Sequence, residues 1–250
     1  MCSCGSSRPS GGGGGGGAAG GAATPCSDCR QRTIPPREVD VAISETISNA
    51  PTTPTDYSAW NGTFGWQSKF TVAVDRPNCS VKVTIKIKVT GTITDAQKTA
   101  WKSAIESKWS NKVKLVCNDP ACPQACTGGY PVIVELRYVG SGEHYTVTAN
   151  TPGAAEGGRA GLGGTTSMTG WGVNDTVDIT HEFGHMLGNV EEYFTTDRVD
   201  YTHGGTVSGF RDAGGGIMNN PSNDPTTGNF HLVAQQAQAA MGGNCTAQTP

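Results

Sequence analysis

Residues 181–185 read HEFGH, and this stretch constrains the fold more than any other part of the chain. On an α-helix, residues four positions apart lie one above the other, so His181 and His185 share one face. Two imidazoles on one face can each give a ring nitrogen to the same metal ion, and Glu182 then projects beside the open position of that metal. The pattern therefore predicts a helix that carries a zinc site with a carboxylate base next to it.

A glycine at position 188 follows the second histidine and is expected to end this helix. Glycine adopts the left-handed backbone conformation at little steric cost, so the chain can turn sharply there. Such a turn brings Glu191 back towards the metal as a third ligand. The adjacent Glu192 also offers a carboxylate and remains the alternative third ligand.

Residues 181–193 read HEFGHMLGNVEEY, which resembles the signature of the metzincin clan of zinc metallopeptidases. That signature is HExxHxxGxx followed by a histidine or an aspartate as the third ligand. The run is also similar to a family of bacterial metallopeptidases that read HEFGHxLGxxDEY. It departs from both patterns at Glu191, whose side chain is one methylene longer than that of aspartate.

The metzincin resemblance also implies a methionine in a tight turn beneath the metal. Residues 214–221 read GGGIMNNP, and their glycines and Asn-Pro pair are typical of turns. In this reading the thioether of Met218 packs against the histidine rings without binding zinc. The alternative is a glycine-rich loop that contains an ordinary buried methionine.

For the fold, the resemblance implies an α+β metzincin-like zincin domain. Its parts would be a mixed twisted sheet, a backing helix, an active-site helix, an irregular lower half from Gly188 to Phe210 and a C-terminal helix. An extended peptide substrate would lie against an edge strand, which we place at residues 144–148, because backbone pairing tolerates many sequences.

For the function, the resemblance implies a zinc-dependent endopeptidase that acts on a protein or peptide. His181, His185 and Glu191 would hold Zn²⁺, and a water would occupy the fourth position. Glu182 would take a proton from that zinc-bound water and pass it to the departing amine, as general base and then general acid.

Two further residues are candidates for roles around this site, and two other functions stay open. Tyr193 and His231 could surround the metal or line the substrate, although His231 also has a plain reading as a surface or core residue. The same scaffold could instead be a non-catalytic, zinc-stabilised binding module or a secreted or injected toxin effector.

The rest of the chain shows strand and helix patterns in alternation. Residues 81–89 alternate strictly between apolar and polar, which predicts a strand with one buried face and one wet face. Trp101, Ile105 and Trp109 share one stripe of a helix predicted from Ala96 to Asn111, which should pack on the sheet. The other predicted elements are strands at 113–117, 131–139, 144–148 and 165–171, a motif helix starting near residues 174–175, and a helix at 230–241.

The composition allows one sizeable domain, which we place at residues 79–250. Residues 1–33 are rich in glycine and cysteine and include an unbroken glycine run from 11 to 17, so we expect this segment to be disordered. Residues 34–78 show no clear pattern and are assigned to the periphery of the domain.

The nine cysteines fall into two groups. Four lie in the N-terminal head as CxC and CxxC pairs, which can indicate a metal or redox site but have no folded surroundings there. The other five would form two disulfides in an oxidising compartment, with the pairing left open. These five are Cys79, Cys117, Cys122, Cys126 and Cys245.

Charge and hydropathy argue against two classes of partner. Charged residues make up 16% of the chain, the net charge is −3 and basic residues are scattered, so we expect no binding to nucleic acid. No apolar run reaches the roughly 20 residues that span a bilayer, so we expect no membrane insertion. The amino terminus lacks a conventional secretory signal, which favours a cytoplasmic protein or release by a non-classical route, and we expect a monomer.

Overall fold

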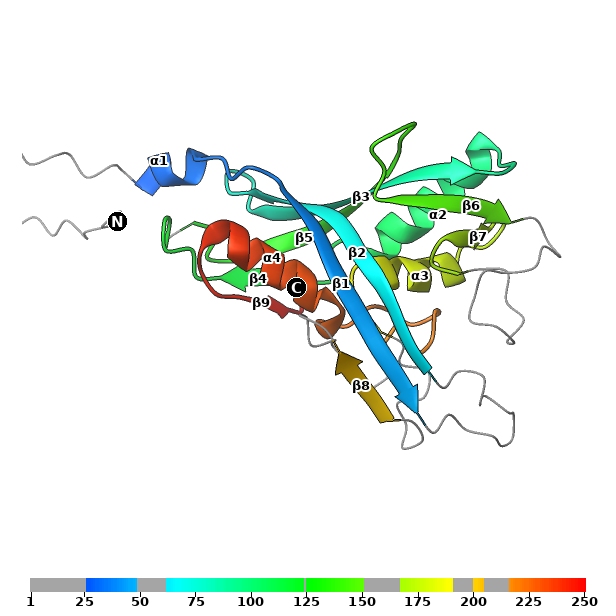
Figure 1. The fold of residues 1–250 in the computed structure, drawn as a ribbon. Helices are drawn as coiled ribbons and strands as arrows, with labels where there is room; N and C mark the ends of the chain where they lie inside the picture. Colours follow the sequence, from blue (N-terminus) through cyan, green and yellow to red (C-terminus); the bar gives the residue numbers. More distant parts are fainter. Residues whose placement is uncertain (1–25, 49–61, 124, 151–166, 191–199, 205–215) are drawn as a thin grey trace, which may run out of the picture.

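The computed structural model of the 250-residue chain describes residues 26–48, 62–123, 125–150, 167–190, 200–204 and 216–250. These residues form an α+β fold, in which helices pack on a mixed, curled sheet (Figure 1). The strands are β1 (Arg37–Ser48), β2 (Gly62–Asp75), β3 (Ser80–Thr90), β4 (Lys114–Cys117), β5 (Tyr130–Tyr138), β6 (Tyr145–Asn150), β7 (Gly170–Gly172), β8 (Asp200–Gly204) and β9 (Cys245–Gln248). The helices are α1 (Cys26–Gln31), α2 (Asp95–Trp109), α3 (Asp178–Met186), α4 (His231–Met241) and the short 3-10 helix η2 (Gly228–Phe230).

The sheet mixes parallel and antiparallel pairing. Its strand order is β8-β1-β2-β3-β5-β4-β9, and β6 pairs with both β3 and β7. Strand β3 runs parallel to β5 and β6, and β6 runs parallel to β7, whereas the other pairs are antiparallel. The mixed sheet predicted from the sequence is therefore confirmed.

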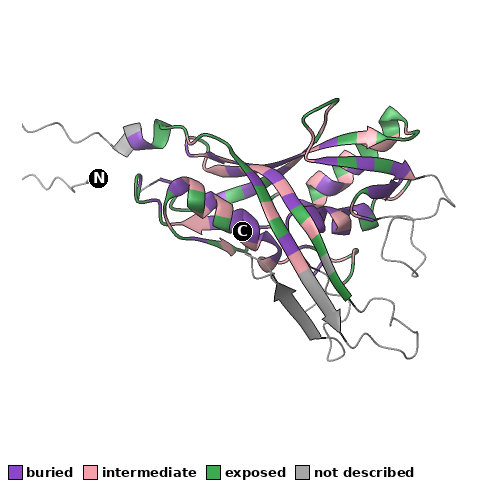
Figure 2. Ribbon diagram, viewed as in Figure 1, coloured by how far each residue is buried: buried purple, intermediate pink, exposed green. Residues whose placement is uncertain are grey.

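Strand β3 has one buried face and one polar face, as its alternating sequence predicts. Val81, Val83, Ile85 and Ile87 are fully buried. Figure 2 shows the same alternation of buried and less buried residues along the strands of the sheet. On the opposite face Lys82 pairs with Glu135 of the adjacent β5, and Lys86 pairs with Glu38 of β1, two strands away. Helices α2, α3 and α4 contribute to the same hydrophobic core as the buried face.

Helix α2 confirms the predicted backing helix. Thr94 caps it, because its hydroxyl accepts from the backbone N–H of Gln97 and the Gln97 side chain accepts from the backbone N–H of Thr94. Trp101, Ile105 and Trp109 are all fully buried on its inner face. The tryptophans therefore belong to the core.

The assignment of residues 34–78 to the periphery is wrong for the part that the structure describes. Strands β1 and β2 pair antiparallel along eleven residues each, from Arg37 opposite Val72 to Ile47 opposite Gly62. Phe70 and Val72 lie in the hydrophobic core. The sequence of β2 does carry the period of a half-buried strand, because apolar residues recur at positions 64, 66, 70, 72 and 74 and only Ser68 interrupts them.

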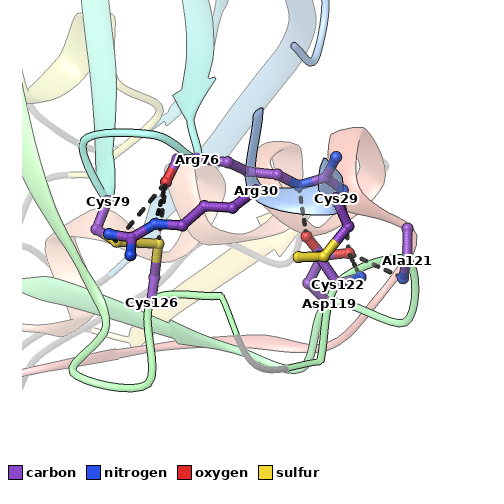
Figure 3. The surroundings of a disulfide bond; sticks show 8 residues. All are labelled: Cys29, Arg30, Arg76, Cys79, Asp119, Ala121, Cys122 and Cys126. Atoms are coloured by element: carbon purple, nitrogen blue, oxygen red, sulfur yellow. Dashed lines mark hydrogen bonds and ion pairs between the residues drawn. A yellow bond between two sulfur atoms is a disulfide. The ribbon is translucent and has the colours of Figure 1, made fainter. Parts of the chain in front are cut away.

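The prediction that residues 1–33 are disordered is wrong for residues 26–33, while residues 1–25 lie outside the described part. Residues 26–31 form α1, and a disulfide joins Cys29 to Cys122 across 93 positions of sequence (Figure 3). Arg30 donates to the backbone carbonyl of Arg76 and to the sulfur of Cys79. A covalent link and two polar contacts hold this segment on the domain, although it has few apolar side chains that could be buried.

Figure 3 also shows a buried ion pair between the two neighbouring disulfides. The Arg76 guanidinium donates two hydrogen bonds, of 2.7 and 3.0 Å, to the two carboxylate oxygens of Asp119. Asp119 also accepts from the backbone N–H groups of Ala121 and Cys122. The two charges therefore compensate each other inside the fold.

The five cysteines of the body are all paired. Two disulfides form among them, Cys79–Cys126 and Cys117–Cys245, as expected, and the fifth, Cys122, pairs with Cys29 of the head. The last pair joins the adjacent strands β4 and β9.

Two predictions concern the margin of the sheet. Strand β6 lies between β3 and β7, but β7 pairs only with residues 148–150, so no described strand pairs with the outer side of residues 145–147. The predicted irregular lower half falls mostly outside the described residues, and residues 200–204 form β8 beside β1. None of the described helices has the length and apolar character needed to cross a membrane.

Candidate metal centre

Helix α3 carries the HEFGH stretch and is packed into the core along most of its surface. It begins at Asp178, three residues after Asp175, whose carboxylate accepts from the backbone N–H groups of Val177 and Asp178. Phe183 lies against Trp109 of α2, with ring centroids 5.9 Å apart. The Trp109 ring nitrogen donates to the carbonyl of Thr180 at 2.9 Å. The helix is thus fixed on α2 by both apolar packing and a buried hydrogen bond.

The two histidines of this helix lie together, as their spacing predicts. The ring centroids of His181 and His185 are 4.9 Å apart, and the ring planes are nearly perpendicular at 84°. His181 is 1% exposed and His185 is 7% exposed. Glu182, between them in sequence, is only partly buried.

A backbone carbonyl orients each histidine ring. Nδ1 of His181 lies 2.9 Å from the carbonyl oxygen of Ile217, and Nδ1 of His185 lies 2.8 Å from that of Asn189. A carbonyl oxygen only accepts, so Nδ1 carries the proton in both rings and donates it. In a neutral imidazole of this tautomer the lone pair is on Nε2. That is the form in which histidine binds a metal through Nε2.

Side chains of strands β2 and β6 hold the C-terminal end of α3. Helix ends leave carbonyls without partners in the helix, and here side chains supply donors. The Trp66 ring nitrogen donates to the carbonyl of His185 at 2.8 Å, and its ring meets the His185 ring edge-on. Ser68 donates to the carbonyl of Met186 at 2.7 Å, and the single hydroxyl proton of Tyr145 is shared between the carbonyls of Gln67, at 2.9 Å, and Met186, at 3.2 Å.

Gly188 ends the turn after α3, as the sequence predicts. Its φ is +90°, in the left-handed region that favours glycine. A Cβ atom there would also collide with the Leu232 side chain of α4. The following residues, Asn189 and Val190, are buried, so the chain turns back into the molecule directly after the helix.

Met218 lies directly beneath the histidine helix. Residues 216–219 form a turn in which the backbone N–H of Asn219 donates to the carbonyl of Gly216 at 3.0 Å. The Met218 side chain is fully buried against Gly184, which lies between the two histidines. The same turn provides the carbonyl of Ile217 that orients His181.

The structure describes only some of the other predicted site residues. Glu191, Glu192 and Tyr193 lie outside the described residues. Among the described residues, no group of three histidine, cysteine or acidic side chains is close enough to hold a metal ion. His231 is the first residue of α4 and is partly buried.

His144 lies away from this site, on the polar face of the sheet. Its Nδ1 accepts from the backbone N–H of Lys86, and its Nε2 lies 3.0 Å from a carboxylate oxygen of Glu38. Burial lowers the pKa of the ring, although the hydrogen bond to Glu38 opposes this. These contacts agree with a structural role for this histidine.

The sequence analysis missed several residues that hold the C-terminal end of α3 or the ring of His185. These are Trp66, Ser68, Tyr145, Asn189 and Asn229. One signal was available for Ser68, because it occupies the same face of β2 as the apolar residues Phe70 and Val72. A polar residue in a buried position usually has a specific hydrogen-bond partner.

Comparison with known proteins gave no match to a family model, to a curated protein or to a solved structure.

Proposed function

We propose that this chain is a zinc-dependent endopeptidase built on a metzincin-like zincin domain. The observation that carries the proposal is the arrangement of His181 and His185. Their rings lie together on a buried helix, and each has its Nδ1 bonded to a backbone carbonyl. This arrangement favours two imidazole ligands presented through Nε2.

The donor set suits zinc. Two neutral imidazoles and one carboxylate form one of the known ligand sets of catalytic zinc sites, which keep one position open. The two imidazoles would come from His181 and His185. We propose Glu191 as the third ligand, with Glu192 as the alternative, because the turn at Gly188 directs the chain back towards the helix.

Glu182 is the residue we propose as the catalytic base. Zinc, when bound, lowers the pKa of water to about 7 and polarises a carbonyl. The carboxylate of Glu182 takes the proton from the attacking water and then gives it to the departing amine. Glu182 is less buried than either histidine, as a group that meets solvent and substrate must be.

Met218 supports the same proposal from a different part of the chain. Its side chain packs on Gly184, and its turn provides the carbonyl that orients His181. A methionine turn beneath the metal is the second feature of the metzincin resemblance. A methionine that only filled space in the core would not be expected specifically against the helix that carries the two histidines.

The proposal is tested by metal content and proteolysis of the same preparations. Zinc per chain is measured by mass spectrometry, and cleavage is measured on casein, an unstructured substrate. The comparison is between the unaltered chain, Glu182→Gln and the control Glu143→Gln, which changes a carboxylate in the turn before β6. We expect one zinc in all three and cleavage in all but Glu182→Gln.

The other outcomes separate the remaining functions. Zinc without cleavage in the unaltered chain would favour a binding module in which the metal only stabilises the fold. Cleavage that persists in Glu182→Gln, or a chain that binds no zinc, would overturn the proposal. Growth arrest of cells that express the unaltered chain but not Glu182→Gln would identify a toxin effector that uses the same chemistry.

A further inference from the structure

One segment, residues 216–230, reaches both histidines of α3. It reaches His181 directly, through the carbonyl of Ile217. It reaches His185 through one intermediate residue, because the side-chain amide of Asn189 donates to the carbonyl of Asn229 at 3.0 Å. The two imidazoles are therefore held from the same segment by two different routes.

Asn189 is the centre of the second route. Its side chain is completely buried, and its Nδ2 donates to two carbonyls, those of Gly184 and Asn229, both at 3.0 Å. Its backbone N–H donates to the carbonyl of Gly184 as well. These bonds fix the peptide unit of Asn189, whose own carbonyl lies 2.8 Å from Nδ1 of His185.

Asn229 is itself held in place. Its Oδ1 accepts from the backbone N–H and the hydroxyl of Thr226, at 2.8 and 3.3 Å, and it is 1% exposed. Buried amides with several bonds are rigid, because loss of any one bond leaves a buried polar group unsatisfied. The bonds from Thr226 through Asn229 to Asn189 thus form one rigid polar chain that ends at His185.

We propose that Asn189 is a positioning residue for metal binding by His185. Its side chain fixes its own backbone, and its backbone carbonyl then fixes the tautomer and the rotation of the imidazole. The inference rests on the proposed zinc function and deepens it. Residues that orient a metal ligand in this way typically contribute 10–100-fold to metal affinity.

A role in capping the helix alone would give a different result, and Ser68 provides the comparison. Ser68 is also completely buried and donates to a carbonyl at the end of α3, that of Met186. It has no bond to either imidazole. Ser68→Ala and Asn189→Ala therefore remove similar support from the helix end, but only Asn189→Ala releases the carbonyl that faces His185.

The experiment compares the full-length chain with these two variants. Zinc affinity is measured by competition with a chromophoric chelator, the Co²⁺-substituted protein is examined by visible absorption, and the metal-free proteins are melted to give Tm. We expect both variants to lower the Tm of the metal-free protein. We expect Asn189→Ala to weaken zinc binding by about 10–100-fold and to alter the Co²⁺ spectrum, and Ser68→Ala to change neither appreciably. If Asn189→Ala does not fold, Asn189→Ser, which keeps a shorter donor, is measured in its place.

The outcomes distinguish this inference from the proposed function. An Asn variant that binds zinc as tightly as Ser68→Ala, with an unchanged Co²⁺ spectrum, overturns the positioning role alone. An unaltered chain that binds no zinc overturns the proposed function together with this inference.

Discussion

The sulfur of Met218 occupies the space that a side chain at position 184 would fill. A Cβ atom added to Gly184 would overlap Sδ of Met218 and come within 3.1 Å of the Trp109 ring. Gly184 lies between the two histidines on α3, so this contact sets how closely residues 216–219 approach the helix. Glycine is the residue that allows this approach.

The first prediction concerns Gly184→Ala, whose cost in stability should be smaller when residue 218 is alanine. In the unaltered chain the new methyl collides with Met218 and Trp109, and overpacking of a core costs about 1–3 kcal/mol. In a Met218→Ala background only the close approach to Trp109 remains. The higher helix propensity of alanine, up to about 1 kcal/mol relative to glycine, then offsets more of the cost. Urea unfolding of the four proteins in this cycle gives both values.

The control for this cycle is Gly128→Ala, because a Cβ atom at position 128 meets nothing within 4 Å. Its effect should be the same with Met218 and with Ala at position 218. If the effect of Gly184→Ala were also independent of residue 218, the close contact described here would not exist.

The second prediction concerns the disulfide between Cys29 and Cys122. It closes a long loop, across 93 positions, and loss of a native disulfide typically costs about 2–5 kcal/mol. Cys29→Ser and Cys122→Ser should each lower the free energy of unfolding by such an amount. The double variant should be no less stable than either single one, whereas additive losses would show that the two cysteines are not bonded. Guanidinium unfolding under non-reducing conditions measures all three.

The third prediction concerns the pH dependence of the Glu135 ion pairs. Partial burial opposes ionisation of Glu135, but hydrogen bonds from Lys82, Arg137 and Thr84 outweigh it and lower the pKa to about 2. A lowered pKa stabilises the fold above the ordinary value of 4.5, and this contribution disappears as the pH falls towards about 2.

Glu135→Gln should therefore lower the free energy of unfolding at pH 7 and have progressively less effect between about pH 4.5 and pH 2. Solvent screens the partly exposed Lys82 and Arg137, so the loss at pH 7 should be no more than about 1 kcal/mol. Urea unfolding at several pH values measures it. An equal loss at pH 7 and pH 2 would contradict an ionic origin.

The fourth prediction identifies the third ligand. Glu191→Ala should weaken zinc binding by more than the roughly 10–100-fold that is typical for removal of an outer partner, and Glu192→Ala should weaken it less. Chelator competition on the two variants gives the order. The reverse order would assign the ligand to Glu192.

Local patterns predicted most of the described elements. The strict alternation of residues 81–89 specified β3, and the stripe of Trp101, Ile105 and Trp109 specified α2, because both periods are direct consequences of backbone geometry. Backbone geometry also predicted that the two histidines share one face of α3 and that the chain turns at Gly188. These features depend on residues that are close together in sequence.

Features that depend on distant residues could not be read in this way. The pairing of Cys29 with Cys122 depends on where α1 meets the body of the domain, and spacing carries no information about it. The place of Asn189 depends on Asn229, forty positions later. Strands β1 and β2 carry the alternation of half-buried strands, but their place in the sheet depends on their pairing with each other and with β3.

The bonds from Trp66, Ser68 and Tyr145 to the last turn of α3 have a consequence for how the histidines would meet a metal. They keep the end of α3 from fraying, so the backbone that carries the imidazoles is already formed when the chain folds. The protein then loses little further conformational entropy when it binds a metal ion. Helix α3 should have the same conformation without and with a bound metal ion. The ion should therefore exchange without unfolding of the helix.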